Sequence, residues 1–421
     1  MQPLYNEFID FLKAKGNNIP SLNEGGYWLD RNFIVIFTSD GKIHKLYKLI
    51  YDKDLSVKAV KHKEYTDRQP ELWAETVERL YPQLEEKMSD SINIIHQGIK
   101  NYPNHDKWVL TSTGKDSTVV LDLVEKVIPD VKVMFNNTSL DVAETYKIVK
   151  SHKDWIITNP KQGFYKWVKE GGFIPSKLAR GCCTIFKEGN SIEWFDQNGT
   201  DKLLLFMGVR NSESAKRADR VDINHNPKWG SRDWYSCLPI RKWSDLDVWI
   251  YMLHNNLTIN PRYKMGYERV GCAVACPYQK LRTQVIDEYF YPKLFYRWHK
   301  ILEEDFISHK KWSCLNCTLE EYHWCWSDSL LRTEPTPEVI QEMIQYTGLD
   351  FDVVSKYFNK TCCECGVSVR NAEALSMNYK FLGTDADQIY CKRCLKKKLN
   401  MKEADWRANI NTFKEQGCKL F

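Results

Sequence analysis

The sequence predicts an α/β protein with a doubly wound, mostly parallel sheet, a small N-terminal α+β unit and a C-terminal zinc-binding module. Apolar strand patterns alternate with helical patterns from Lys107 onward, which is typical of a parallel sheet covered on both faces. Pairs of cysteines with metal-ligand spacing dominate the last part of the chain. With 421 residues and 43% hydrophobic content, the chain is long enough for several packed units.

Changes in pattern along the chain predict four parts. The boundaries follow a break at Pro103 and Asn104 and the start of an aromatic-rich, cysteine-rich region near residue 290. We expect an N-terminal α+β and helical unit at residues 1–100, the main α/β domain at 101–290, a helical extension at 291–355 and the zinc module with a basic tail at 356–421.

The N-terminal unit is expected to contain a short amphipathic helix, a hairpin and a long helical region. Leu4–Lys15 has a helical pattern, and Phe33–Phe37 and Ile43–Ile50 flank a turn. Glu71–Lys100 is helical apart from an interruption at Pro82.

The main domain is expected to alternate strands and helices. Ser244 and Asp247 form a capping box before the last predicted helix. We expect strands at Trp108–Thr111, Val131–Phe135, Trp155–Thr158 and Leu203–Met207, and helices at Asp116–Val127, Val142–His152 and Asp245–Asn255.

Composition argues against a membrane or secreted protein. The longest apolar runs, such as Leu203–Val209, are far shorter than the roughly 20 residues of a membrane-spanning helix, and Met1–Asp10 lacks a basic, then apolar, leader. We therefore expect a soluble, cytoplasmic protein. The formal charge of +5 is nearly balanced, but residues 391–421 hold nine Lys or Arg against three Asp or Glu. Any polyanion contact is expected there.

The segment after the first main-domain strand has the features of an anion-binding loop. Thr111–Thr118 reads T-S-T-G-K-D-S-T and leads directly into a helical pattern. A strand-to-helix turn presents unpaired amide groups and the positive end of a helix, and Lys115, Ser112 and Ser117 add donors around Gly114. The spacing differs from the Walker A motif. The alternative is an ordinary capped turn on the surface.

This loop and four further segments resemble the PAPS reductase superfamily of adenine nucleotide α-hydrolases, the PP-loop proteins. The phosphate loop of the ATP-using members reads S-G-G-K-D-S, and Ser112–Ser117 reads S-T-G-K-D-S. The resemblance covers about residues 107–280. The other matching segments are Asn137–Asp141 with Glu144 and Thr145; Gly172–Pro175 with Arg180–Thr184 and Lys187; Gly208–Ser214 with Arg217; and Leu238–Ile240 through to Cys276 and Pro277.

The resemblance implies a bound adenine nucleotide at the carboxyl ends of the strands, where open parallel sheets bind ligands. Lys115, Asp116 and Arg210 would be the catalytic residues. A helix starting at Ser212 or Ser214 would put Arg210 and Arg217 on one face, although a solvated basic face is the alternative. The implied nucleotide-binding residues are Ser112, Thr113, Gly114, Lys115, Asp116, Ser117, Asn137, Thr138, Glu144, Gly208, Arg210, Glu213 and Arg217.

The ATP-type loop implies an enzyme that uses ATP with Mg²⁺, releases pyrophosphate and adenylates an acceptor for sulfur transfer. Among relatives it looks most like the DNA phosphorothioation sulfur-transfer ATPases, which implies a sulfur donor protein and a nucleic acid as partners. A thiol-dependent adenylyl-sulfate reductase is the first alternative, although the reductase tail E-C-G-x-H is replaced by Glu415–Cys418, which reads E-Q-G-C. A nucleotide-sensing regulatory protein is the second.

Fourteen cysteines without a leader sequence suggest reduced thiols available for metal binding. Cys182, Cys183, Cys272 and Cys276 resemble the pair-plus-pair pattern that holds a [4Fe-4S] cluster in adenylyl-sulfate reductases, with buried core thiols as the alternative. A second set has zinc-like spacing, and its Cys314 and Cys317 are rival cluster ligands together with Cys272 and Cys276. This set consists of Cys314, Cys317, His323 and Cys325.

The last cysteines give the strongest metal signal. Cys362, Cys365, Cys391 and Cys394 form two C-x-x-C units, the second opening a helical pattern, which is a treble-clef-like zinc arrangement. Such a short segment with few aliphatic residues needs the metal for stability. Lys396–Lys398 follow the last cysteine and would contact nucleic-acid phosphates or stay solvated.

Overall fold

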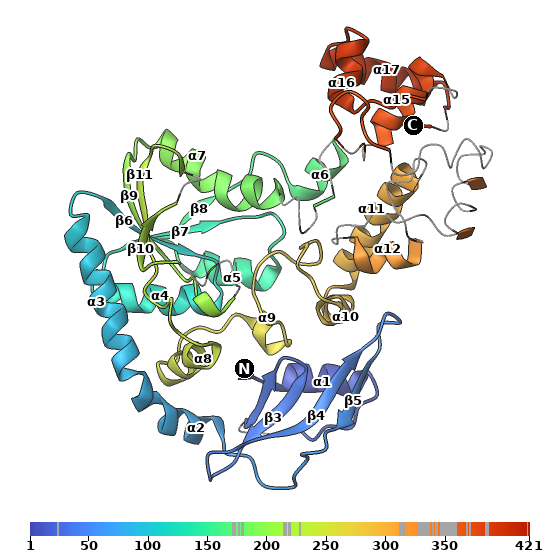
Figure 1. The fold of residues 1–421 in the computed structure, drawn as a ribbon. Coiled ribbons are helices and arrows are strands. Elements are labelled where there is room, and N and C mark those ends of the chain that lie inside the picture. The colour runs from blue at the N-terminus through green and yellow to red at the C-terminus, as the bar shows by residue number, and fades with distance from the viewer. Residues whose placement is uncertain are drawn as a thin grey trace. The chain divides into compact units, whose positions relative to one another are not determined.

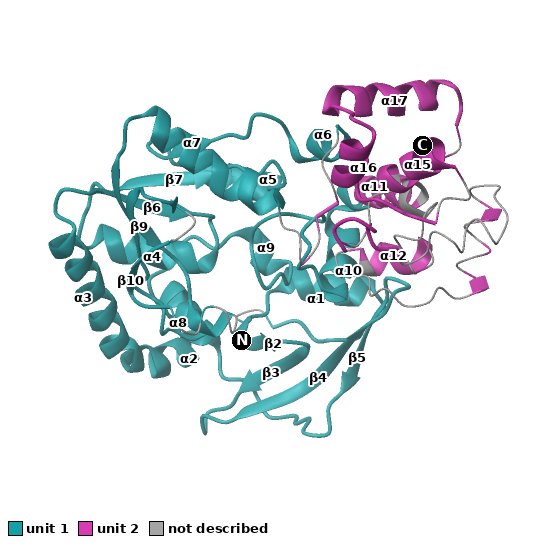
Figure 2. Cartoon of the chain, turned by 45° about the horizontal axis from the view of Figure 1, so that its top comes forward, with its two compact units in different colours: residues 1–173, 180–295 teal, residues 174–179, 296–421 magenta. Residues whose placement is uncertain are grey.

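The computed structural model separates the chain into two compact units, which are described one at a time (Figure 2). The first unit comprises residues 1–173 and 180–295, and the second comprises residues 174–179 and 296–421. The four-part division stays a prediction. The structure describes all residues except 23–24, 171–173, 176, 178–180, 214–216, 218–219, 227–228, 311–316, 318, 327–336, 339–340, 342–343, 346–359, 368, 370–371, 384–386 and 419.

The first unit begins with an antiparallel sheet of order β1-β2-β3-β4-β5 (Figure 1). Side chains alternate between its two faces, as the strand period of two requires. Ile34 and Ile36 face a core that includes Phe8 of the first helix, whereas Val35 and Phe37 face the core shared with the main sheet. The elements are β1 (Gln2–Pro3), α1 (Asn6–Ala14), β2 (Tyr27–Asp30), β3 (Phe33–Phe37), β4 (Ile43–Tyr51) and β5 (Val57–Lys61).

The helical stretch after this sheet is broken where the sequence predicts. Helix α2 (Trp73–Leu80) gives way to the 3₁₀ turn η1 (Tyr81–Leu84), which holds Pro82 near its start, and α3 (Glu85–Asn101) follows. Proline cannot donate a backbone hydrogen bond, so the tighter turn replaces the continuous helix at this point.

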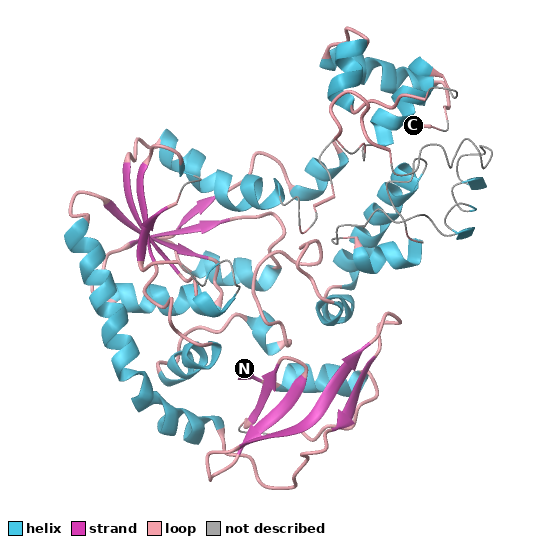
Figure 3. Cartoon of the chain, viewed as in Figure 1, coloured by secondary structure: helices cyan, strands magenta, loops and turns pink. Residues whose placement is uncertain are grey.

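The main sheet has the order β10-β11-β9-β6-β7-β8, and only the pairing of β10 with β11 is antiparallel among its described strands (Figure 3). Strand β6 lies between β7 and β9, so the chain winds outward in opposite directions from it. The elements are β6 (Asp106–Thr111), α4 (Lys115–Glu125), β7 (Lys132–Asn136), α5 (Ala143–Ser151), β8 (Ile156–Thr158), α6 (Phe164–Lys169), η2 (Cys183–Gly189), α7 (Asn190–Gln197), β9 (Lys202–Met207), η3 (Asn211–Glu213), β10 (Ile223–His225), β11 (Asp233–Cys237), α8 (Asp245–His254), α9 (Pro261–Lys264) and α10 (Leu281–Phe290).

Helices cover both faces of this sheet, which confirms the doubly wound prediction. On one face Val109 packs in the core that contains α3, α4 and α8; on the other, Trp108 packs against Phe195 of α7. The predicted capping box is also present, since the Ser244 hydroxyl accepts from the Asp247 amide and the Asp247 carboxylate accepts from the Ser244 amide. Searching the described helices finds none with the length and apolar character to cross a bilayer.

The second unit contains helices and a small core of its own. Trp406, which is fully buried, packs there with Leu375, Leu395 and Ile410. Helix α11 begins in the first unit and continues into the second. The described helices are α11 (Pro292–Lys310), α12 (Leu319–Cys325), α15 (Ala372–Leu382), α16 (Lys392–Lys398) and α17 (Glu403–Glu415).

Gly266, two residues after the end of α9, tests how tightly the N-terminal unit packs against the main domain. Its φ is +90°, and an added Cβ would overlap the Phe8 ring of α1. We expect Gly266→Ala to lower the free energy of unfolding by roughly 2 kcal/mol, because backbone strain and overpacking act together. Urea denaturation measures the change. Gly163→Ala is the matched control, since no atom lies within 4 Å of its added Cβ; equal midpoints for both variants would contradict the tight junction.

Candidate functional site

The predicted anion-binding loop lies between β6 and α4, at the point where the sheet reverses its winding direction. Gly114 is the N-cap residue of α4, with an extended backbone. The Ser117 hydroxyl donates to the Gly114 carbonyl at 2.9 Å and accepts from the Ser112 amide at 3.2 Å. Ser117 therefore shapes the turn, and the first turn of α4 leaves amide groups that have no partner within the helix.

Thr113 adopts a left-handed backbone conformation, with φ of 56°. This conformation is costly for a β-branched residue, so the surroundings must hold it in place. The Thr113 amide donates to the Thr111 hydroxyl at 3.1 Å, and the Asn260 side chain donates to the Thr113 hydroxyl at 2.8 Å. The family pattern quoted above has glycine here, and the hydrogen bonds show how threonine is tolerated.

Four charged side chains meet beside this loop. Lys115 Nζ lies 2.9 Å from Asp116 and 3.1 Å from Asp245, and Arg210 Nη2 lies 2.9 Å from Asp245 while its Nε donates to Asp116. Lys115 and Arg210 are each 4% exposed. Burial acts to lower the pKa of Lys115, but Tyr263, Asp116 and Asp245 outweigh it and raise the pKa, so the lysine is charged. The two cations are fully paired by the two carboxylates.

Gly208 allows β9 to approach the first turn of α4. An added Cβ at Gly208 would lie 2.6 Å from the Asp116 backbone carbonyl carbon and 2.7 Å from the Ser117 amide nitrogen. Real Cβ atoms do not approach backbone so closely, so only glycine fits here. Gly208 brings Arg210, two residues later, within reach of Asp116.

A second group of cations lies next to this cluster. The segment predicted to carry both arginines on one helix lies partly outside the described residues, and its described part contains the short turn η3. Arg217 pairs with Glu213, which also lies 3.7 Å from Arg269. Burial lowers the pKa of Arg217, and the neighbouring Arg269 and Arg220 lower it further. Several guanidinium groups with few carboxylates make this an anion-attracting region.

The short helix α9 contacts the phosphate loop and was missed by the sequence analysis. The Tyr263 hydroxyl accepts from the Lys115 amide at 2.9 Å, and Asn260 also donates to Thr145 at 3.1 Å. The Asn260-Pro261 dipeptide could have indicated a capped turn, but no sequence signal predicts its partners. Asp245 was recognised only as the start of a helix.

Arg262, which lies between Asn260 and Tyr263, contacts a second loop. Arg262 donates to the Gly271 carbonyl at 2.7 Å, and its guanidinium lies 4.0 Å from the Tyr267 ring centroid. Asp287, completely buried, accepts from the Tyr267 hydroxyl at 2.6 Å and from Gln279. Burial raises the pKa of Asp287 to about 6, which leaves it ionised at neutral pH beside Arg262. The network fixes the segment that contains Cys272 and Cys276.

The loop after β7 packs against the same segment. Thr138 donates to Asp141 at 2.8 Å, and the Cys272 thiol lies 3.7 Å from the Thr138 hydroxyl. Asn137 donates to Asn159 at 2.8 Å, and Glu144 accepts from Tyr291 at 3.2 Å. Asn137, Thr138 and Glu144 therefore have structural partners here, and their role in nucleotide binding stays a prediction.

Cys182, Cys183, Cys272 and Cys276, all within the described part of the chain, influence one another electrostatically, but no three of their sulfurs lie close enough together to form a metal-ligand group. A hydrogen bond with Cys183 raises the pKa of Cys182, and burial and the neighbouring thiols Cys183, Cys272 and Cys276 add to the effect. Burial raises the pKa of Cys272 to about 12 and also raises that of Cys276. The first pair precedes and opens the π-helical segment η2, a rare conformation that often marks functional sites.

Comparison with known proteins places the phosphate loop in a family. The model of the phosphoadenosine phosphosulfate (PAPS) reductase domain matches residues 106–277. The chain carries a PAPS reductase domain. The match covers the region for which the motifs indicated the same superfamily.

Relatives of this PAPS reductase domain include two uncharacterized proteins of Methanocaldococcus jannaschii. One is 34% identical over 201 residues, which are 47% of this chain and 41% of the relative; the other is 27% identical over 227 residues, 52% of this chain and 54% of the relative. The chain thus spans about half of each archaeal protein. An adenosine 5'-phosphosulfate reductase of Bacillus cereus is 24% identical over 195 residues, 45% of this chain and 80% of that enzyme.

Two solved structures are similar at low TM-scores. The PAPS reductase of Candida auris is 18% identical, with 47% of this chain and 93% of that chain covered and a TM-score of 0.35. The U34-tRNA thiolase NcsA of Methanococcus maripaludis, solved with its [4Fe-4S] cluster, is 14% identical, with 52% and 78% covered and a TM-score of 0.31. Neither likeness bears on activity.

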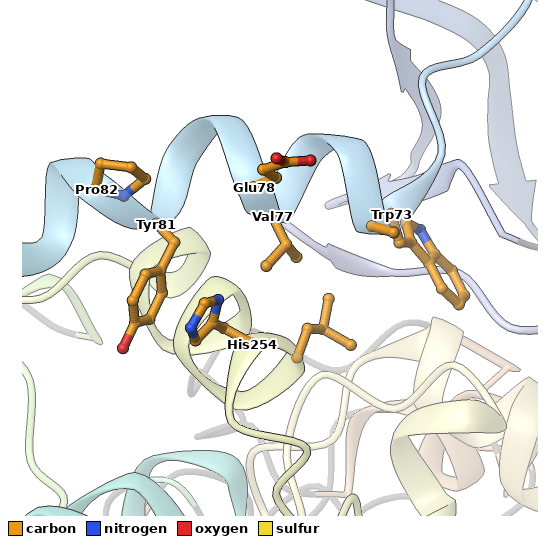
Figure 4. Close-up of a pocket in the computed structure, with 8 residues that line it drawn as sticks. Trp73, Val77, Glu78, Tyr81, Pro82 and His254 are labelled. Carbon is orange, nitrogen blue, oxygen red and sulfur yellow. The ribbon is translucent and has the colours of Figure 1, made fainter.

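An apolar cavity in the first unit is lined by residues of α2, η1 and α8 (Figure 4). The Tyr81 and His254 rings stack there with centroids 3.4 Å apart. His254 ends α8, whereas Asp245 at the opposite end of the same helix joins the charge cluster. None of the predicted site residues lines this cavity, which is formed by Trp73, Ala74, Val77, Glu78, Tyr81, Pro82, Leu253 and His254.

Outside the PAPS reductase domain, the predicted cysteine quartet converges. The sulfurs of Cys362, Cys365, Cys391 and Cys394 all lie within 4.8 Å of one another, the one such group of three or more metal-ligand side chains among the described residues. Burial acts to raise the pKa of Cys362, but amide groups of Cys391, Cys365 and Glu364 outweigh it and lower the pKa to about 6. Four converging thiols could hold a metal such as zinc or an iron–sulfur cluster.

The remaining predicted metal set is only partly described. Cys314 lies outside the described residues, as does the side chain of Cys325. Cys317 is buried, and His323 on α12 lies beside His299 of α11, with ring centroids 4.7 Å apart. Burial lowers the pKa of His299 to about 4 and lowers that of His323 as well, so both imidazoles are neutral at pH 7.

Substitution within the cysteine quartet tests its role. We expect Cys391→Ser to remove about one equivalent of bound metal per chain and to unfold residues 360–421, because metal binding supplies folding free energy to so small a core. Metal analysis and limited proteolysis measure both effects. Cys363→Ser is the control, since Cys363 is exposed and outside the quartet. Full metal content in Cys391→Ser would contradict the assignment.

Proposed function

We propose that the protein binds ATP with Mg²⁺ and transfers the adenylyl group to an acceptor, releasing pyrophosphate. The observation that carries this proposal is the buried, charge-paired Lys115 at the start of α4, beside Asp116, Arg210 and Asp245. The negative phosphates of ATP would pair with Lys115 and Arg210, and the positive Mg²⁺ would pair with Asp116 and Asp245.

Binding would exchange the partners of the four charges. In the free protein the carboxylates of Asp116 and Asp245 hold Lys115 and Arg210 in place. When ATP binds, the phosphates take the two cations, and the carboxylate oxygens, which are the hard ligands Mg²⁺ prefers, face the metal. Mg²⁺ would neutralise charge on the phosphates. The exchange leaves no buried charge unpaired, which would otherwise be costly.

The proposed reaction is a nucleophilic displacement at the α-phosphorus of ATP. A nucleophilic oxygen of the acceptor forms a bond to the α-phosphorus, the bond from that phosphorus to the bridging oxygen breaks, and pyrophosphate leaves with the electron pair. Lys115 and Arg210 would stabilise the charge that develops on the leaving group. The proton of an acceptor hydroxyl is released to solvent or to a nearby base.

We propose that the adenylated acceptor then receives sulfur. Cys182, Cys183, Cys272 and Cys276 interact electrostatically in the same unit as the phosphate loop, and four thiolates suit a [4Fe-4S] cluster. Bound there, a cluster would supply sulfur-handling or redox chemistry. We further propose zinc for the Cys362 quartet, because tetrahedral Cys₄ sites typically hold it.

An adenylyl-sulfate reductase is the second candidate. The similarity to a Bacillus adenosine 5'-phosphosulfate reductase and the electrostatic interaction among Cys182, Cys183, Cys272 and Cys276 favour it. Products distinguish the two: pyrophosphate from ATP supports adenylation, whereas sulfite from adenylyl sulfate with a thiol reductant supports reduction.

A nucleic-acid acceptor is proposed through the basic C-terminal region. Lys392 and Lys396 both pair with Glu403 at 2.8 Å, which reduces their availability to phosphates. Lys397 and Lys398, at the end of α16, are the better candidates for phosphate contact.

Lys115→Ala tests the nucleotide site. We expect its affinity for Mg-ATP to fall about tenfold or more, because a charge-assisted bond to phosphate is worth about 1.5–3 kcal/mol. Calorimetric titration measures the affinity, and a pyrophosphate assay follows turnover. Lys126→Ala is the matched control at the other end of α4. Equal ATP affinity for wild type and Lys115→Ala would remove the basis of the proposal.

Separate cysteine substitutions test the proposed cluster. Protein reconstituted anaerobically should contain about four irons at this site and lose its broad absorption in air. We expect Cys183→Ser to lower the iron content and Cys237→Ser, a buried thiol elsewhere in the unit, to leave it unchanged. Cys314→Ser serves as the rival: iron lost only in that variant would assign the cluster to the other cysteine set.

A further inference from the structure

Two histidines face each other between α11 and α12 in the second unit. The rings of His299 and His323 have centroids 4.7 Å apart and planes tilted by 44°. Packing fixes the two helices beside each other, because Trp298 contacts Trp326 and the Tyr322 hydroxyl donates to Asp305 at 2.6 Å. The two imidazoles therefore meet in a defined place.

One imidazole nitrogen of this pair is buried without a hydrogen-bond partner. The Nε2 atom of His323 is inaccessible to solvent and has no hydrogen-bond partner in the structure. Leaving a buried polar atom unsatisfied is costly, and such atoms in native proteins call for an explanation such as a bound ion. A neutral imidazole nitrogen is a strong metal ligand.

One carboxylate on each helix lies near His323. Glu303 lies one helical turn after His299 on α11, and Glu320 lies three residues before His323 on α12, so each shares a helix face with its histidine. Both act electrostatically on His323, which shows that they are near it. Both are exposed, so a change of rotamer can turn a carboxylate oxygen towards the imidazoles.

We propose that His299 and His323, together with Glu303 and Glu320, form a binding site for a divalent transition metal such as zinc. Two imidazole nitrogens and one or two carboxylate oxygens are a common donor set for zinc, and spacings of three and four residues on facing helices suit chelation. This site uses no thiolate and is separate from the Cys362 quartet. It does not depend on the proposed ATP chemistry.

Zinc titration of the full-length protein with its cysteine sites already loaded tests the site. Wild type should bind one further equivalent of zinc, and His299→Asn and His323→Asn should each lose it. His96→Asn, which changes an exposed histidine on α3, should keep it, as should Cys317→Ser. Added zinc should raise the melting temperature of wild type and His96→Asn and leave that of His299→Asn unchanged.

Because Glu303 and Glu320 are exposed, replacing them does not disturb the packing between α11 and α12. The double variant Glu303→Gln, Glu320→Gln should bind this zinc at least tenfold more weakly. Unchanged zinc affinity in this double variant, or loss of the equivalent in Cys317→Ser with retention in both histidine variants, would overturn the proposal.

Discussion

The pairing of Lys115 and Arg210 with Asp116 and Asp245 constrains the surrounding architecture, because the four charges come from three separate parts of the chain. Burying cations requires nearby anions, and the anions must arrive at fixed distances. The close approach of β9 at Gly208, the phosphate-loop turn after β6 and the capped start of α8 provide those positions. The winding reversal next to β6 brings the three segments to one edge.

The sequence predicted what depends on local pattern. The hairpin, the break at Pro82, the Ser244 capping box and the alternating main-domain elements all follow from short-range periodicity and turn chemistry, and the structure confirms them. The Cys362 quartet was also predictable, because two C-x-x-C units fix the ligands in advance. At such metal sites the ligand chemistry, and not contacts with distant segments, determines which residues are needed.

Contacts between distant segments could not be predicted in the same way. Nothing in the residues around Asp245 shows that its carboxylate meets Lys115, and the hydroxyl of Tyr263 bonds the Lys115 amide although both belong to separate turns. The helix predicted to carry Arg210 and Arg217 stays a prediction, because residues 214–216 and 218–219 lie outside the described residues. Arg217 pairs with Glu213, four residues earlier, after the short turn η3.

Cysteines occupy two contrasting environments in this chain. Amide groups outweigh burial and lower the pKa of Cys362 to about 6, whereas burial and hydrogen bonds with the other quartet cysteines raise the pKa of Cys394 to about 12. Burial likewise raises the pKa of Cys272, in the other set, to about 12. A metal that binds either set must therefore displace protons from some of its thiols.

Helix α9 has contacts with two loops at once. Asn260 and Tyr263 hold the phosphate loop, while Arg262, between them, holds the carbonyl of Gly271 next to Cys272. A single helical turn has no internal freedom to let one side move without the other. The loop between β6 and α4 and the cysteine loop consequently behave as one mechanical element, and whatever orders the cysteines also sets the position of Thr113 and Lys115.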